Sequence, residues 1–217
     1  MTIIAGVEEA GRGPVIGPMV MCIATIDKKD EPELKKIGVK DSKLLTPGQR
    51  TTIANKLKKI LLDYKIEIIE PIEIDSALQS DTLNLNWLEA VTTAKLIHAV
   101  KCDKVILDCP STNIKAYEQY IKKLLNKDVE LIAEHKADVN HLIVGAASII
   151  AKVNRDNEIK KIKKKYKLPD FGSGYPADPK TVEFLEENYD KYPIFRKTWE
   201  SYKRIVRAKD QKTLSEF

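Results

Sequence analysis

The sequence predicts a mixed α/β fold, in which helices cover both faces of one sheet and a helical appendage follows at the C-terminus. Two apolar runs near the start, residues 3–7 and 20–26, flank a turn rich in Gly and Pro, so we expect them to pair as an antiparallel hairpin. Strand-like and helix-like runs then alternate as far as residue 166. The length of 217 residues, with 43% hydrophobic and 32% charged residues, is typical of one globular domain with a small appendage.

The other strands are short runs that are apolar or alternate between polar and apolar side chains. Residues 65–70 alternate, and Pro71 ends the run. Residues 105–107 are apolar and lead into Asp108. We therefore predict strands over residues 3–7, 20–26, 65–70, 105–108 and 129–134.

Helices are predicted from apolar side chains at helical spacing and from N-terminal caps. Thr46 and Asp178 are candidate caps, each followed by a proline at the first helical position. The first half of residues 140–166 is apolar nearly all round and should be central, whereas the basic second half should face solvent. We predict helices over residues 31–37, 47–63, 72–78, 85–100, 113–125, 140–166, 179–189 and 194–207.

Charge and cysteine content narrow the class of protein. The net charge is +5, and lysine and arginine concentrate after residue 160. This basic surface indicates a polyanionic partner, although residues 160–167 also fit a solvated helix face. No apolar run reaches the roughly 18 residues of a membrane span, and the N-terminus lacks an export signal. Three cysteines without metal-ligand spacing fit free thiols, so we expect a soluble, cytoplasmic protein without zinc.

Acidic residues recur at or just past the ends of predicted strands. Glu8 and Glu9 follow the first strand, Asp108 ends the fourth and Asp138 leads into the long helix. Gathered together, such carboxylates repel one another unless cations share the site, and oxygen ligands favour Mg²⁺ or Mn²⁺. Two such ions can support phosphodiester hydrolysis. Taken singly, Asp108 also fits a turn and Asp138 a helix cap.

Two further features concern the first acids and the turn after them. Adjacent strand residues face opposite ways, so at most one of Glu8 and Glu9 should point squarely at a site on one face, unless the strand ends there and twists. Next, Arg12 stands between Gly11 and Gly13. Glycines let backbone N–H groups approach a phosphate or sugar, and an arginine can form a forked contact with the same group. The turn is therefore a candidate substrate site.

Five motifs in order resemble type 2 ribonuclease H (ribonuclease HII) in its archaeal form. They span about residues 3–205 and comprise residues 8–18 (EEAGRGPVIGP), 41–43 (DSK), 134–138 (EHKAD), 146–153 (AASIIAKV) and 172–176 (GSGYP). The resemblance implies a ribonuclease H-like, five-stranded mixed sheet. It also implies a catalytic domain over residues 1–166, a loop and C-terminal helices over residues 167–207 that complete the substrate groove, and a tail over residues 208–217.

The resemblance further implies an activity. Such an enzyme hydrolyses the RNA strand of RNA–DNA hybrids and single ribonucleotides embedded in duplex DNA. It cuts 5′ to the ribonucleotide and leaves 3′-hydroxyl and 5′-phosphate ends. The expected setting is ribonucleotide removal in DNA replication and repair, by a monomer without membrane association.

The resemblance also assigns roles to particular residues. The four acids that bind metal and carry out catalysis in this family correspond to Glu8, Glu9, Asp108 and Asp138. Reading of the 2′-hydroxyl at the RNA–DNA junction falls on Gly11, Arg12 and Gly13. Tyr175 falls on the tyrosine that stacks on the deoxyribose past the junction. Support of phosphate or of site geometry falls on Lys43, Lys136 and Ser148.

One acid departs from the family pattern, because the first acid of the family is aspartate and this chain has Glu8. The extra methylene of Glu8 is compatible with lower activity, with a shift of metal preference towards Mn²⁺, or with accommodation by a backbone adjustment. The substitution is also compatible with an engineered change. An alternative function is therefore a catalytically weakened hybrid-binding protein. A third possibility is an integrase-like strand-transfer enzyme of the same fold, but the junction motif and Tyr175 argue against it.

The C-terminal tail carries a possible partner site. Gln211, Leu214 and Phe217 have the spacing of a peptide that binds a sliding clamp (PCNA), and a short helical turn would present Leu and Phe on one face. The usual second aromatic residue is missing. The alternative is a frayed terminus.

Overall fold

The centre of the molecule is a five-stranded mixed sheet, as predicted. The computed structural model describes residues 1–39 and 44–215, with side chains up to residue 211. The strands lie in the order β3-β2-β1-β4-β5. Their bounds are β1 Ile3–Ala10, β2 Met19–Asp27, β3 Asp63–Ile69, β4 Lys104–Asp108 and β5 Glu130–Glu134.

β1 is the middle strand and joins the two halves of the sheet. It pairs antiparallel with β2, which pairs antiparallel with β3, and it runs parallel to β4, which runs parallel to β5. Parallel strands end at the same edge of a sheet. The carboxyl ends of β1, β4 and β5 therefore lie together.

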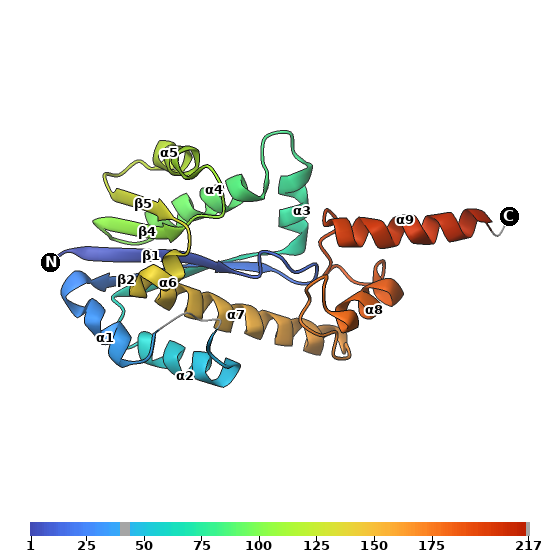
Figure 1. The fold of residues 1–217 in the computed structure, drawn as a ribbon, viewed down its shortest axis with the longest axis horizontal. Coiled ribbons are helices and arrows are strands. Elements are labelled where there is room, and N and C mark those ends of the chain that lie inside the picture. The colour runs from blue at the N-terminus through green and yellow to red at the C-terminus, as the bar shows by residue number, and fades with distance from the viewer. Residues whose placement is uncertain (40–43, 216–217) are drawn as a thin grey trace.

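Helices cover both faces of the sheet (Figure 1). One face packs against α1 (Glu31–Lys36), α2 (Pro47–Leu57) and α7 (Leu142–Tyr166). The other packs against α3 (Pro71–Gln79), α4 (Leu85–His98) and α5 (Ile114–Leu124). The shorter and C-terminal elements are η1 (Lys28–Asp30), α6 (Ala137–Asn140), α8 (Pro179–Asn188) and α9 (Glu200–Ser215).

A close contact between sheet and helix is made at Gly6 in β1. A Cβ atom at this position would lie 2.5 Å from backbone atoms of Ile143 and Val144 in α7. The small residue therefore lets α7 sit directly on the central strand. The start of α7 is thereby held on β1 two residues before Glu8.

Two predicted helices have different bounds in the structure. The helix predicted over residues 47–63 ends at Leu57, because β3 already begins at Asp63 and Leu62 N donates to Thr25 O at 2.9 Å. The helix predicted over residues 140–166 is divided, with α6 and α7 separated by His141 in an extended conformation. Asp138 consequently lies inside α6 and is not a residue ahead of a helix.

The C-terminal helix begins later than predicted, at Glu200, and continues to Ser215. Residues 194–196 are instead paired with residues 15–17. Gly17 N donates to Ile194 O at 2.8 Å and Arg196 N donates to Val15 O at 2.9 Å. A third apolar cluster fixes this region to the rest of the protein, and it includes Ile16, Phe171, Phe184, Phe195 and Tyr202.

Within residues 1–39 and 44–215, none of the helices has the length and apolar character needed to cross a bilayer.

Candidate active site

The four predicted acids come from two neighbouring strands and from α6. Glu8 and Glu9 lie inside β1, which runs on to Ala10, and not in the turn that follows it. Val7 is level with Leu107 in the parallel pair, so Glu8 is beside Asp108 at the end of β4. Asp108 Oδ1 accepts a hydrogen bond from Ala137 N at 2.9 Å, which ties the strand end to the turn of helix that carries Asp138.

Glu8 and Glu9 lie on opposite faces of β1, as the strand period requires. Ile4 belongs to the core under α7, whereas Ala5 and Val7 belong to the core under α4. Glu8 therefore shares the α7 side, and Glu9 shares the α4 side. Asp108, at the end of the neighbouring strand, raises the pKa of both carboxyls.

Burial and mutual repulsion shift the protonation of these acids. Burial, and then the charge of Glu9, raise the pKa of Glu8 well above its usual value, with smaller effects of Asp108 and Asp138 in the same direction. Burial, and then Asp108, raise the pKa of Glu9 to about 7. The Lys152 ammonium lowers both values. The acids therefore need more positive charge than the protein itself supplies.

These residues fit a divalent cation. Glu8 Oε2 is buried and accepts no hydrogen bond from the described residues. An orphaned carboxylate oxygen among repelling acids is suited to an oxygen-seeking ion such as Mg²⁺ or Mn²⁺. In the described part of the chain, no three His, Cys, Asp or Glu side chains already have the spacing of a metal site.

The turn after β1 is held from behind by the C-terminal segment. Arg196 is fully buried and donates to the carbonyls of Gly11 at 2.6 Å, Arg12 at 2.9 Å and Gly17 at 3.0 Å. Trp199 Nε1 donates to Gly13 O at 3.1 Å. Burial lowers the pKa of Arg196 to about 9. Residues 11–13, which we call the reading turn after the role expected for them, are therefore held in shape by residues far along the chain.

The side chain of Arg12 points to α4. Its Nε donates to Glu89 Oε1 at 2.8 Å and its Nη2 donates to Asn86 Oδ1 at 2.7 Å. Neither partner was identified from the sequence. The signal in the sequence was a glutamate, Glu89, within the predicted helix 85–100. The structure buries this glutamate on α4, together with Ala90 and Thr93.

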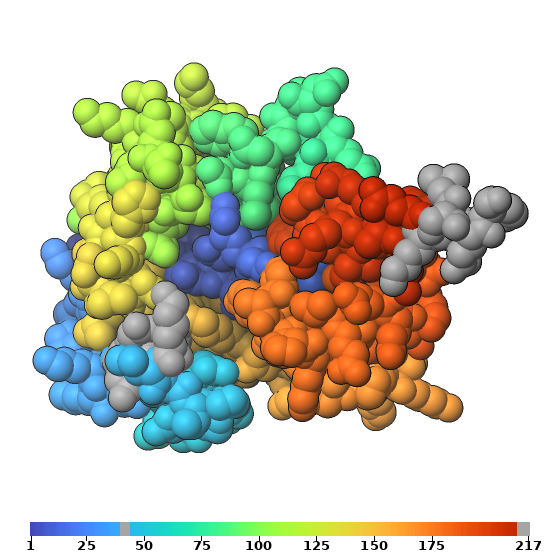
Figure 2. All heavy atoms as spheres, turned by 45° about the vertical axis from the view of Figure 1, so that its right-hand side comes forward, coloured from blue at the N-terminus to red at the C-terminus, as the bar shows by residue number. Residues whose placement is uncertain are grey.

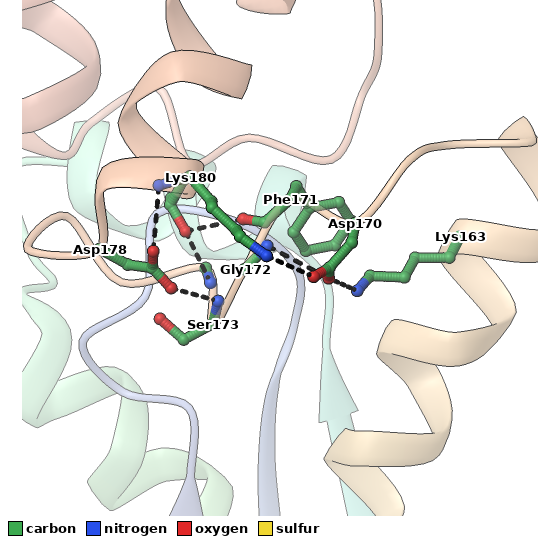
Figure 3. Close-up of polar contacts among 9 residues, drawn as sticks. Lys163, Asp170, Phe171, Gly172, Ser173, Asp178 and Lys180 are labelled. Atoms are coloured by element: carbon green, nitrogen blue, oxygen red, sulfur yellow. Dashed lines mark hydrogen bonds and ion pairs between the residues drawn. The ribbon is translucent and has the colours of Figure 1, made fainter.

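Tyr175 is carried by a loop, residues 170–178, that polar contacts hold in shape (Figure 3). Asp178 accepts from the backbone N–H groups of Ser173 at 2.7 Å and Lys180 at 3.0 Å. Asp170 accepts from the ammonium groups of Lys163 at 2.7 Å and Lys180 at 3.3 Å. These lysine contacts lower the pKa of Asp170 to about 2. Both ends of the loop are thereby fixed.

The Tyr175 loop meets the reading turn. Val15 N donates to Gly174 O at 2.8 Å, and a Cβ on Gly13 would lie 3.2 Å from the Tyr175 ring. Tyr175 is 44% exposed. Two predicted substrate residues from opposite ends of the chain are thus in contact, with the tyrosine facing solvent.

The remaining predicted residues differ in how far the structure places them. Lys136 has a left-handed backbone (φ 61°) at the start of α6. Ser148 is fully buried in α7, where its Oγ accepts from Lys152 Nζ at 3.2 Å. Gln211 is exposed on α9. Lys43, the Leu214 side chain and Phe217 lie outside the described residues.

The site is a hollow in the molecular surface. Figure 2 shows the N-terminal segment, in dark blue, recessed between the yellow segment that contains α6 and the orange segment that contains the Tyr175 loop. The five-stranded mixed sheet, with acids on β1, β4 and α6, agrees with the ribonuclease H-like fold that the sequence motifs imply.

The chain belongs to the Ribonuclease HII family, whose sequence profile matches residues 5–202. The predicted family is therefore confirmed. The chain is a ribonuclease H, a phosphodiester hydrolase that acts as an endoribonuclease on RNA–DNA hybrids.

Relatives match the chain along nearly its full length. Ribonuclease HII of Pyrococcus horikoshii is 48% identical over 222 residues, covering 99% of this chain and 98% of the relative. The crystal structure of ribonuclease H2 from Pyrococcus horikoshii OT3 has a TM-score of 0.87 at 47% identity, covering 95% of this chain and 98% of that one. A structure of the PCNA:RNase HII complex from Archaeoglobus fulgidus has a TM-score of 0.83 at 34% identity, covering 91% and 95%.

Proposed function

We propose that this enzyme cuts duplex DNA on the 5′ side of a single embedded ribonucleotide, leaving 3′-hydroxyl and 5′-phosphate ends, and so removes ribonucleotides in DNA replication and repair. The observation that carries the proposal is the contact of the Tyr175 loop with the reading turn, directly after the acids of β1. This contact supports the proposal, because it joins the turn expected to recognise the ribose to the ring expected to stack on the next sugar. We further infer that one chain suffices, because these parts all come from the same chain.

Catalysis is assigned to the four acids. Glu8, Glu9, Asp108 and Asp138 would hold Mg²⁺ or Mn²⁺, which supplies a nucleophilic water and stabilises the leaving oxygen. The carboxylates orient the ions, and the raised pKa values of Glu8 and Glu9 mean that ion binding displaces protons.

Substrate recognition is assigned to the turn, the loop and three supporting residues. Gly11 and Gly13 admit the ribose close to the backbone, and Arg12 contributes N–H donors. The Tyr175 ring stacks on the adjoining deoxyribose. Supporting roles are proposed for Lys136, Ser148 and Lys43, of which the last lies outside the described residues.

Glu8 is the residue on which the efficiency of the enzyme depends. Its buried, orphaned Oε2 supports a role as metal ligand. Its extra methylene relative to the family's aspartate moves that oxygen by about a bond length, whereas productive geometry tolerates only about 0.5 Å. The competing proposal is that the chain binds hybrids but cleaves them weakly.

A cleavage assay tests the proposal. A DNA duplex with one ribonucleotide is incubated with the protein in Mg²⁺ or in Mn²⁺, beside an all-DNA duplex and the Glu8→Asp variant. We expect a single cut 5′ to the ribonucleotide and no cut in the all-DNA duplex. Cutting of the all-DNA duplex would refute ribonucleotide specificity. No cutting in either metal, with activity restored in Glu8→Asp, would instead favour the weakly cleaving alternative.

A second function is proposed for the tail. The related protein of Archaeoglobus fulgidus was solved in complex with PCNA, and this chain is 34% identical to it. Gln211, Leu214 and Phe217 have the spacing of a clamp-binding peptide, and Gln211 is exposed on α9. We infer that residues 211–217 bind a sliding clamp.

A further inference from the structure

An acid and an amide on α4 hold the guanidinium of Arg12. Glu89 Oε1 accepts a hydrogen bond from Arg12 Nε at 2.8 Å, and Asn86 Oδ1 accepts one from Arg12 Nη2 at 2.7 Å. From these contacts we infer that Glu89 and Asn86 are positioning residues, which fix Arg12 for reading the RNA–DNA junction. The inference rests on the role proposed above for Arg12.

The contacts use one edge of the guanidinium. Asn86 and Glu89 are three residues apart, so they project from the same face of α4. They take the Nε and Nη2 groups, which share an edge of the planar group. An arginine has five N–H donors, and the described residues accept from none of the other three. Those donors are left for the substrate, in an orientation that α4 dictates.

The burial of Glu89 points to a role beyond the fold. The residue is 1% exposed, and its Oε2 accepts no hydrogen bond from the described residues. A buried carboxylate is costly unless it is paired, and an apolar side chain would fill the same place at lower cost. The ion pair with Arg12 at 2.8 Å is the contact that compensates this burial, and the charge of Arg12 lowers the pKa of Glu89.

The platform that carries both positioning residues is rigid. Asn84 caps α4 by accepting from Trp87 N at 3.0 Å. The Trp87 ring packs on Tyr120 with ring centroids 4.5 Å apart, which joins the start of α4 to α5. Asn86 and Glu89 flank this anchored residue. A guanidinium attached there keeps one orientation before substrate arrives.

A double-mutant cycle tests whether the two residues act through Arg12. We expect Asn86→Ala and Glu89→Gln each to lower kcat/KM on the single-ribonucleotide duplex by about 5- to 20-fold. In the Arg12→Ala background, each should cost less than about 2-fold. The Mg²⁺ concentration for half-maximal rate should stay unchanged in Asn86→Ala, because that variant removes no charge near the acids. Thr92→Val serves as the control on α4, and its rate should match the wild type, since among the described residues the Thr92 hydroxyl donates to Leu88 O within its own helix.

The outcomes separate this inference from the proposed function. Losses that persist undiminished in the Arg12→Ala background would overturn the positioning role and leave the function of Arg12 intact. Unchanged junction cleavage in Arg12→Ala would instead refute the role of Arg12 itself. If Glu89→Gln fails to fold, the double-mutant cycle of the half-buried Asn86 with Arg12 still tests whether a residue of α4 acts through Arg12.

Discussion

At the scale of single residues, Glu9 makes the stability of the metal-free protein depend on pH. Its pKa is about 7 when folded, against an ordinary value of 4.5, because burial and Asp108 disfavour the charge. The folded state therefore binds more protons than the unfolded state between these values, and stability falls as pH rises from about 4.5 to 7. We expect the metal-free protein to lose about 1 to 3 kcal/mol over this range through Glu9 alone.

Urea unfolding in EDTA at pH 5 and pH 8 measures this loss, with Glu9→Gln as the matched variant. The variant should lose less stability than the wild type between the two pH values. Mg²⁺ should restore stability to the wild type mainly at pH 8, where the carboxylates are ionised. Equal pH dependence in the two proteins would contradict the assignment to Glu9.

At the scale of elements, the seating of α7 on β1 depends on Gly6. A Cβ there would press on the Ile143 and Val144 backbone, which cannot move without displacing the helix. We expect Gly6→Ala to cost about 2 to 3 kcal/mol in the free energy of unfolding and to lower activity, because α7 and the adjoining α6 would shift relative to β1. Chemical denaturation and the cleavage assay measure both effects.

Gly48 provides the control, since it lies in α2 and a Cβ there would meet no atom of the described residues within 4 Å. Gly48→Ala should be neutral or stabilise by about 0.5 kcal/mol, because alanine favours the helix. A Gly6→Ala protein as stable as Gly48→Ala would show that the helix is free to move away.

The segment between α8 and α9 is a second element whose role can be measured. Arg196 bonds three carbonyls of the turn after β1, and its removal would leave them buried and unsatisfied. We expect Arg196→Met to destabilise the protein by about 2 to 4 kcal/mol. Arg207→Met is the control, because Arg207 pairs with Glu200 in solvent, and it should change stability by less than about 0.5 kcal/mol. If the two variants unfold at the same urea concentration, the hydrogen bonds of Arg196 do not stabilise the turn after β1.

At the scale of the whole molecule, the tail should be separable from the catalytic site. Deleting residues 211–217 should abolish binding to a sliding clamp. Cleavage without the clamp should stay within about 2-fold of the full chain, because the four acids and the reading turn are held by parts of the protein outside this tail. Size-exclusion chromatography with the clamp, beside the cleavage assay, measures both. Retained clamp binding would place the contact elsewhere on the protein.

The proposed division at residue 166 can also be judged at this scale. Residues beyond it supply Arg196 and Trp199 to the reading turn, and Phe171 and Phe195 pack against Ile16. We therefore expect the fragment 1–166 to lose cooperative unfolding, since these buried groups would be exposed. The division stays a prediction about roles in substrate binding, with both parts needed for one fold.

The sequence alone determined the sheet, the family and the candidate residues, because these depend on local patterns. Apolar runs and alternation marked all five strands, and short motifs carried the resemblance. The predicted ends of helices were wrong where contacts with distant segments set them. Residues 194–196 carry a helical pattern, yet they pair with residues 15–17, since those backbone groups need partners.

Only the tertiary structure decided how the candidates are supported. The period of one strand already predicted that Glu8 and Glu9 face opposite ways, but the parallel register that sets Asp108 beside Glu8 depends on two strands distant in the sequence. Glu89 and Arg196 looked like ordinary charged residues of helices, but packing buries them against the reading turn. The physical reason is that a sequence records each side chain's chemistry, whereas burial and contact depend on which distant segments meet.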